Sequence, residues 1–212
     1  MKISLINGSQ KTGESSSGII LDRLHDLIAA KAHEVKIYKS GIQFFDTKTL
    51  KDIISGEIIV LAFPLYVDSI PSHTLKILME LEKAIKTEQS KNIMAYAIVN
   101  NGFYEGQQNH LALEMVKHWC EHCGISFGGG IGQGAGGMVE SVKGKPFNKG
   151  PFGNLERALQ SLVKKIELKE NYGIQYLNPN FPRFLYNMLG NKMWRETAYK
   201  NGLNKKDILT RL

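Results

Sequence analysis

The chain has 212 residues, enough for one domain with an appendage, and a chain of this length needs no metal or disulfide for stability. Its 42% hydrophobic and 22% charged residues exclude a disordered chain, and no apolar run approaches the roughly 18 residues of a membrane span. The net charge of +7 is uneven: residues 1–142 hold 13 Lys/Arg and 15 Asp/Glu, whereas residues 143–212 hold 14 and 5. Because the excess of positive charge is confined to the last third of the chain, it favours a charged groove or an interface over nucleic-acid binding.

The N-terminus and the two cysteines indicate the cellular compartment of the protein. The N-terminus leads directly into a strand-like segment, which leaves no room for a signal peptide. Cys120 and Cys123 are the only cysteines, too few for a disulfide scaffold. We therefore expect a cytoplasmic protein with no stable membrane insertion.

Apolar runs alternate with helical patterns through the first 170 residues. Strands are predicted at 3–6, 35–38, 58–63, 93–99 and 125–127. Helices are predicted at 16–31, 47–55, 72–87, 108–123 and 154–169, with Ser72 as the cap of the third and Gly124 ending the fourth. Five strands alternating with helices predict an α/β fold, a doubly wound parallel sheet with right-handed crossovers and helices on both faces.

The chain leaves this regular pattern after residue 170. Residues 178–182 (NPNFP) are typical of a linker, and residues 183–199 have the pattern of a basic amphipathic helix. We predict a domain at 1–170 and a C-terminal extension at 171–212. A helix of this kind more often packs on its own domain or on a second subunit than on a membrane, so we expect the extension to contribute to a homodimer.

The loop after the first strand has the composition of an anion site. Residues 7–18 read NGSQKTGESSSG, and a helix begins within them. Backbone N–H groups at a helix N-terminus and nearby hydroxyls bind phosphate, and Lys11 supplies a counter-charge. The spacing is not that of a P-loop, and an ordinary serine-rich helix cap remains an alternative.

Two more loops are expected at the same edge of the sheet, where doubly wound folds bind their ligands. The loop after the third strand reads PLYVDSIPSHTLK (64–76), and the loop after the fourth reads NNGFYEGQQN (100–109). Both place an aromatic residue beside turn-forming residues, which suits a flat ring held between loops.

With these motifs, residues 1–170 resemble the flavodoxin-like NAD(P)H-dependent FMN reductase family. The resemblance implies a flavodoxin-like five-stranded sheet of order 2-1-3-4-5 and noncovalent FMN. For the FMN phosphate it implies Ser9, Lys11, Ser15, Ser16 and Ser17. For one side of the isoalloxazine ring, with backbone amides near its N5 edge, it implies Pro64, Leu65, Tyr66 and Val67. For the other side it implies Asn100, Asn101, Gly102 and Tyr104.

The function expected from the resemblance is an FMN-dependent NAD(P)H oxidoreductase. Its acceptor would be a quinone, a nitro compound, a flavin or a similar small molecule, and no side chain need be catalytic because the flavin supplies the chemistry. One alternative is a flavodoxin-type electron carrier without NAD(P)H activity of its own. Another is a flavin-free protein on the same fold.

Two further patterns admit more than one interpretation. Gly132, Gly134 and Gly137 match the dinucleotide-binding G-x-G-x-x-G pattern, but no helix follows directly, which argues against that use. The family resemblance implies instead that the glycine-rich run 128–137 lets the backbone approach the flavin or nicotinamide closely. Cys120-x-x-Cys123 is compatible with buried structural residues, with a redox pair, or with a metal site that includes His118 and His122. We expect the structural role and no metal.

Overall fold

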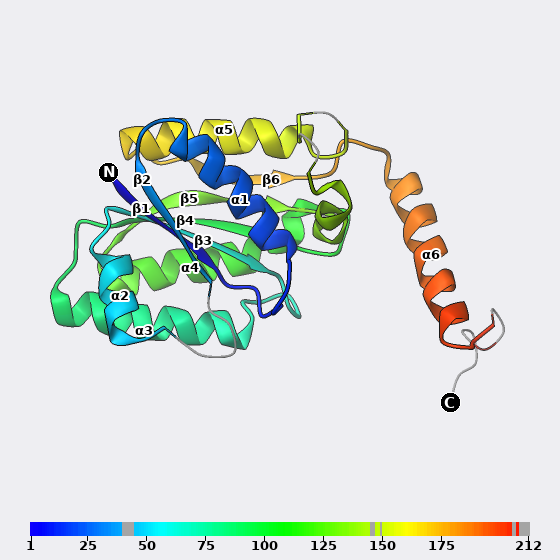
Figure 1. Ribbon diagram of the computed structural model, residues 1–212, viewed down its shortest axis with the longest axis horizontal. Helices are drawn as coiled ribbons and strands as arrows, with labels where there is room; N and C mark the ends of the chain where they lie inside the picture. The colour runs from blue at the N-terminus through cyan, green and yellow to red at the C-terminus, as the bar shows by residue number, and fades with distance from the viewer. Residues whose placement is uncertain (40–44, 145–146, 149, 205–206, 208–212) are drawn as a thin grey trace. The chain divides into compact units, whose positions relative to one another are not determined.

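The computed structural model describes residues 1–39, 45–144, 147–148, 150–204 and 207 (Figure 1). These residues divide into two compact units, Met1–Pro179 and Asn180–Leu212, which we describe separately.

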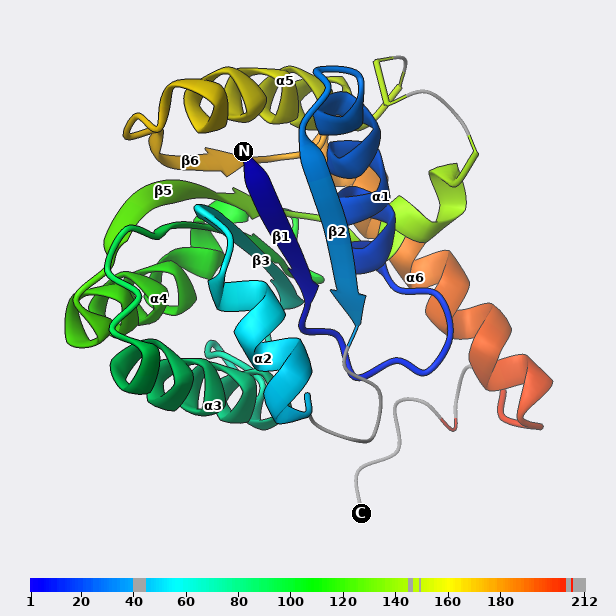
Figure 2. The same ribbon diagram turned by 60° about the vertical axis from the view of Figure 1, so that its left-hand side comes forward.

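The first unit is built on a six-stranded sheet in which every strand pairing is parallel. The strand order is β2-β1-β3-β4-β5-β6, and Figure 2 shows β2 beside β1 at one edge. The strands are β1 (Lys2–Asn7), β2 (Glu34–Lys39), β3 (Ile58–Pro64), β4 (Met94–Asn100), β5 (Ser126–Gln133) and β6 (Gly173–Leu177). This is the predicted doubly wound flavodoxin-like sheet, extended by one strand.

Helices cover both faces of this sheet, as predicted. They are α1 (Ser16–Ala29), α2 (Thr47–Ile54), α3 (Ser72–Glu88), α4 (His110–Cys123) and α5 (Gly153–Leu168), with the 3-10 segments η1 (Gly106–Asn109) and η2 (Gly136–Val142). Alternate residues of each central strand point to opposite cores: Val60 packs with α1 and α5, and Leu61 packs with α2, α3 and α4. The sheet is therefore buried on both faces, which explains the continuous apolar run of β3.

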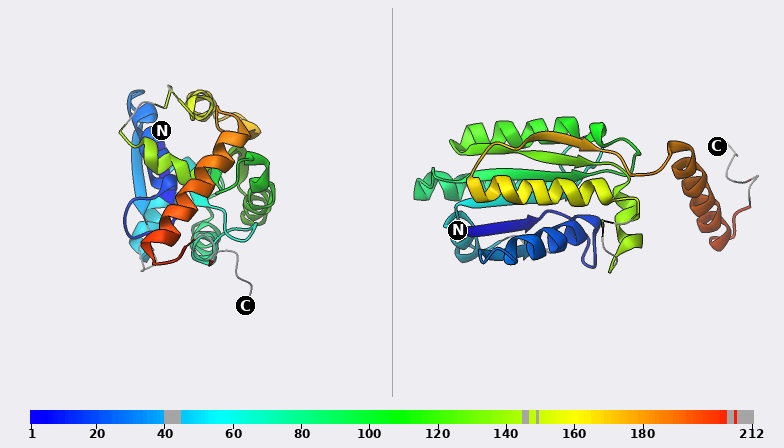
Figure 3. Two further views of the ribbon diagram at one scale, coloured as in Figure 1. Left: turned by 90° about the vertical axis from the view of Figure 1, so that its right-hand side faces the viewer. Right: turned by 90° about the horizontal axis from the view of Figure 1, so that it is seen from above.

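Helices α1 and α5 lie side by side on one face (Figure 3). Arg23 of α1 makes a two-pronged contact with the buried Glu156 of α5, at 2.9 Å from Nε and 2.5 Å from Nη2. This contact holds the pKa of the Glu156 carboxyl below its usual range. Because Glu156 would otherwise be an unpaired buried charge, the pair fixes how the two helices meet.

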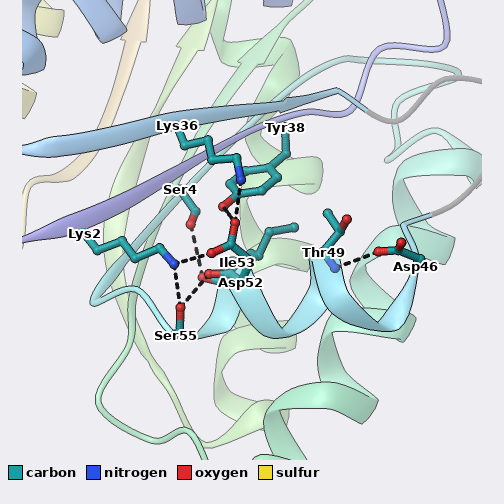
Figure 4. Close-up of polar contacts among 9 residues, drawn as sticks. All are labelled: Lys2, Ser4, Lys36, Tyr38, Asp46, Thr49, Asp52, Ile53 and Ser55. Atoms are coloured by element: carbon teal, nitrogen blue, oxygen red, sulfur yellow. Dashed lines mark hydrogen bonds and ion pairs between the residues drawn. The ribbon is translucent and has the colours of Figure 1, made fainter.

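On the other face of the sheet, hydrogen bonds to Asp52 link α2 to strands β1 and β2 (Figure 4). Its carboxylate accepts hydrogen bonds from Lys2 of β1 at 2.5 Å, from Lys36 of β2 at 2.6 Å and from the Tyr38 hydroxyl at 2.7 Å. These donors hold the pKa of the Asp52 carboxyl well below its usual range. The N-terminus of α2 is capped by Asp46, which accepts from the Thr49 N–H at 2.7 Å.

Two predictions were wrong, one about the number of strands and one about the residue that caps α3. The sheet has six strands because residues 173–177, which we placed in the extension, pair in parallel with β5. Ser72 does not cap α3: Pro71 occupies the N-cap position, and Ser72 is the first helical residue with no capping hydrogen bond. Proline is favoured here because the first N–H groups of a helix lack partners within it.

The glycine-rich run was also misread, because part of it is strand. A side chain at Gly128 would overlap the Tyr96 ring, and one at Gly129 would overlap the Gly173 backbone of β6. Gly134 is equally close to the carbonyl of Tyr104. Protein atoms therefore occupy the space at these three glycines, where we had expected a flavin or a nicotinamide.

The described residues of the second unit form the helix α6 (Arg183–Lys200), close to the predicted span. Its apolar residues are distributed around the helix axis, so the predicted single apolar face is not present. Several large apolar side chains are exposed, among them Phe184, Met188 and Trp194. Among the described residues, no helix is long and apolar enough to cross a membrane.

Candidate functional site

The loops that follow β1, β3 and β4 meet at the carboxyl edge of the sheet, and Asn100 joins them. Its buried side-chain amide donates to Ser17 Oγ of α1 at 2.7 Å and to the Phe63 carbonyl of β3 at 3.1 Å. Its backbone carbonyl accepts from the Leu65 N–H at 2.7 Å. Asn100 therefore positions the other two loops and keeps little surface for a ligand of its own.

The loop after β1 wraps around the N-terminus of α1. Ser15 is the N-cap, and its Oγ accepts from the Gly18 N–H at 3.1 Å. In the described part of the chain, the N–H groups of residues 12–17 donate no hydrogen bond, although Ser15, Ser16 and Ser17 are buried residues. The first N–H groups of a helix lack partners within it, and such groups are suited to binding an anion.

The side chains predicted to bind the phosphate are gathered at this loop, but several already have protein partners. Ser9 is buried, and its Oγ accepts from the Lys11 N–H at 3.4 Å. The Ser17 Oγ accepts a hydrogen bond from the side-chain amide of Asn100. Lys11 Nζ and Ser16 Oγ both contact one carboxylate oxygen of Glu140, at 2.6 and 3.3 Å.

The loop after β3 forms a tight turn at residues 66–69. The backbone groups of Tyr66 and Ser69 bond to each other in both directions, at 3.1 and 3.0 Å. Val67 and Asp68 between them have φ of 48° and 57°, which is the geometry of a type I′ turn. A β-branched residue in this region is strained, and the Val67 side chain is 98% exposed, so no packing accounts for it.

Pro64 and Leu65 lie just before this turn and are half-buried, and Tyr66 is exposed. The loop after β4 is held by Asn101, whose Oδ1 accepts from the Phe103 N–H at 2.8 Å and whose Nδ2 donates to the Glu105 carbonyl at 3.0 Å. Gly102 is exposed, and a side chain there would meet no atom within 4 Å. Tyr104 is half-buried, and neighbouring Phe103 is exposed. Both loops thus present aromatic surface near this edge.

A pocket beside the phosphate loop does not suit an anion. It is lined by residues of α1 and α5 and by Lys143, Gly144, Phe147 and Asn148. The carboxylates of Glu14, Asp22, Asp26 and Glu156 line it together with Arg23 and Lys143. Burial and the neighbouring Asp26 raise the pKa of the Asp22 carboxyl. The pocket is rich in acidic groups, so it is less suited to an anion than the loop after β1 is.

The two cysteines are buried in α4 away from these loops. Burial raises the pKa of the Cys123 thiol to about 12 and that of Cys120 higher still, which opposes the thiolate that redox or metal chemistry requires. His118 contacts Glu121 and His122 contacts Glu82, at 3.1 and 3.2 Å. Among the described residues, no group of three or more His, Cys, Asp or Glu is arranged to hold a metal ion.

Glu140 is the site residue that sequence reasoning missed. It lies on η2, 129 residues after its partner Lys11. No spacing rule connects residues so far apart, so only the fold reveals this contact.

Comparisons with known proteins agree with this architecture. No protein-family model and no curated protein matches the sequence. The solved structures that resemble it include RosB with a bound 8-demethyl-8-formylriboflavin-5′-phosphate, at TM-score 0.58 and 14% identity over 81% of this chain and 82% of that one. An NADH:FMN oxidoreductase in its apo form has TM-score 0.57 and 13% identity, over 81% and 90%. An NADPH-quinone reductase from P. pentosaceus has TM-score 0.56 and 10% identity, over 78% and 97%. At these identities the comparison establishes the fold: the chain is an α/β protein of the flavodoxin-like type.

Proposed function

We propose that the protein is an FMN-dependent NAD(P)H oxidoreductase that passes a hydride to a quinone, a nitro compound, a flavin or a similar small acceptor. The observation that carries this proposal is the set of unpaired N–H groups in the buried residues Ser15, Ser16 and Ser17, beside the ammonium group of Lys11. Solved structures of the same fold include an NADH:FMN oxidoreductase and an NADPH-quinone reductase, which supports the same class of reaction here.

The loop residues fit the two ends of FMN. The N–H groups of residues 15–17, the Ser16 hydroxyl and Lys11 would hold the phosphate. Tyr66 and Phe103 offer exposed aromatic surface for the ring. In the described part of the chain the N–H groups of Val67 and Asp68 donate no hydrogen bond, so the strained turn has donors for a ring edge.

When bound, FMN supplies a ring that takes a hydride at N5 and gives it to an acceptor. The chain's part in this reaction is binding and orientation. Asn100 keeps the phosphate loop and the loop after β3 in a fixed relation, so that phosphate and ring can be held together. Since donor and acceptor would use the same ring edge, they must take turns, and we expect ping-pong kinetics with loose acceptor specificity.

A visible absorption spectrum of the purified protein mixed with FMN tests the cofactor, and anaerobic addition of NADH or NADPH tests the reaction. We expect flavin absorption that is bleached by one of the two nucleotides and restored by a quinone. A protein that stays colourless with FMN would contradict the cofactor assignment. Bound flavin that is reduced only by a separate reductase would instead establish the electron-carrier alternative.

A further inference from the structure

The phosphate loop already holds a carboxylate that belongs to the protein itself. Glu140 Oε1 accepts from Lys11 Nζ at 2.6 Å and from Ser16 Oγ at 3.3 Å. Both donors belong to the set that the proposed function assigns to the FMN phosphate. We propose that Glu140 is an intramolecular competitor of the FMN phosphate, which must displace this carboxylate to bind. This inference rests on the proposed function.

The backbone that carries Glu140 is anchored independently of this contact. The preceding residue, Val139, is fully buried, and the Gly136 N–H at the start of η2 donates to the Asn101 carbonyl at 2.6 Å. Displacement therefore requires only a rotation of the Glu140 side chain, while η2 stays in place. A tethered group of this kind competes at high effective concentration, because it never leaves the vicinity of the loop.

The contact is also weak enough to be displaced. The side chains of Lys11 and Glu140 are 54% and 38% exposed, and exposed ion pairs contribute little stability. A phosphate brings more negative charge than one carboxylate and more acceptor oxygens, which can also reach the free N–H groups of residues 12–17. Glu140 thus lowers the affinity for FMN without blocking it.

The proposed competition should affect the affinity for FMN but not the affinity for riboflavin. Glu140 opposes the phosphate and not the ring, so it reduces the preference for FMN over riboflavin, which has the same ring and no phosphate. The dissociation constants of both ligands, measured by flavin fluorescence with the full-length protein, test the proposal. We expect Glu140→Gln to bind FMN about two- to five-fold more tightly than the wild type, and riboflavin equally well.

Two further variants separate the contact from its charge. Glu14→Gln removes one negative charge from the loop after β1 itself, but Glu14 pairs with Lys143, so we expect both dissociation constants to stay unchanged. Glu140→Asp keeps the charge and shortens the side chain, so we expect it to tighten FMN binding as Glu140→Gln does. Agreement of these three variants supports the competitor role.

Other outcomes would overturn it. Equal tightening by Glu14→Gln and Glu140→Gln would mean a general charge effect, and weaker FMN binding by Glu140→Gln would mean that Glu140 organises the loop for FMN. A Glu140→Gln variant with the same FMN and riboflavin dissociation constants as the wild type would overturn the competition while leaving flavin binding intact. A wild type that binds neither flavin would contradict the proposed function itself.

Discussion

Val67 has a backbone conformation that its side chain disfavours, and no described residue of the first unit packs on that side chain. Its φ of 48° costs a β-branched residue of the order of 1–2 kcal/mol, and its side chain is 98% exposed. Val67→Gly should therefore raise the free energy of unfolding by about 1 kcal/mol, since glycine enters this region freely. Urea denaturation measures the change.

Asp68→Gly is the matched control, because Asp68 has φ of 57° in the same turn and aspartate tolerates this region better. We expect a smaller gain from it. If Val67→Gly lowers the stability, the valine side chain has a packing role. Flavin affinity should be unchanged in Val67→Gly, because the proposed contact uses the backbone N–H.

The sequence predicted that the loops after β1, β3 and β4 lie together, but it did not predict the hydrogen-bond partners of their side chains. Ser15 and Ser17 were expected at the phosphate, yet their hydroxyls bond to Gly18 and Asn100. Composition identifies hydroxyl groups near a helix start, whereas their partners depend on residues brought close by the fold. The free backbone N–H groups next to these hydroxyls carry no sequence signal beyond the helix start itself.

Among the elements, α2 depends on one carboxylate for its attachment to β1 and β2. Asp52→Asn should lower the melting temperature at neutral pH, because Lys2 and Lys36 lose their shared anion. The folded-state pKa of Asp52 is lowered from an unfolded value of about 3.9, so its stabilising effect is present above about pH 4 and is lost as the pH falls toward the folded pKa.

The difference in melting temperature between wild type and Asp52→Asn should thus shrink as the pH is lowered below about 4. Asp26→Asn serves as control, since Asp26 is exposed and its contact with His25 is 3.6 Å long. A constant difference across this pH range would show that the charge of Asp52 is not what stabilises α2.

The loops after β4 and β5 pack too closely for a side chain at Gly134. A Cβ there would overlap the Tyr104 carbonyl and lie 2.9 Å from the Gly106 nitrogen. Because both neighbours are backbone, they cannot rotate away, and Gly134→Ala should reduce the free energy of unfolding by about 1–3 kcal/mol. At Gly137 a Cβ would meet no atom within 4 Å, so Gly137→Ala should change it by less than about 0.5 kcal/mol in the same urea titration. Equal effects would contradict the close packing.

The helices were predictable because their apolar residues repeat with a helical period, as in α3, and the inner strands because they are short continuous apolar runs, as in β3. The errors lie where tertiary packing overrides local preference. β5 contains four glycines, which disfavour strands in isolation, and it exists because β4 and β6 approach its backbone closely. β6 has only five residues and is half-buried at an edge, so its alternation of Ile174 and Tyr176 was too short to identify as a strand.

We propose that the second unit helps to hold two copies of the chain together, because its helix exposes Phe184, Met188, Met193 and Trp194. Deletion of residues 181–212 should convert a dimer to a monomer, measured by light scattering.

In the full chain, Met188→Lys with Met193→Lys should have the same effect, because two charges would enter an apolar contact. Asn187→Lys with Asn191→Lys adds the same charges at polar, exposed positions of the same helix and should leave the dimer intact. A dimer that survives the deletion would assign the interface to the first unit.

The order of the strands also determines which strand edges lack a partner while the chain is being synthesised. From β3 onward each new strand is added beside the one before it in the chain, so the sheet can grow in one direction as the polypeptide leaves the ribosome. Until Leu177 has been synthesised, the glycine-rich outer edge of β5 has no partner, and an open strand edge invites pairing with other chains. The short sixth strand therefore covers the long glycine-rich edge of β5 and leaves an edge of only five residues on this side of the sheet.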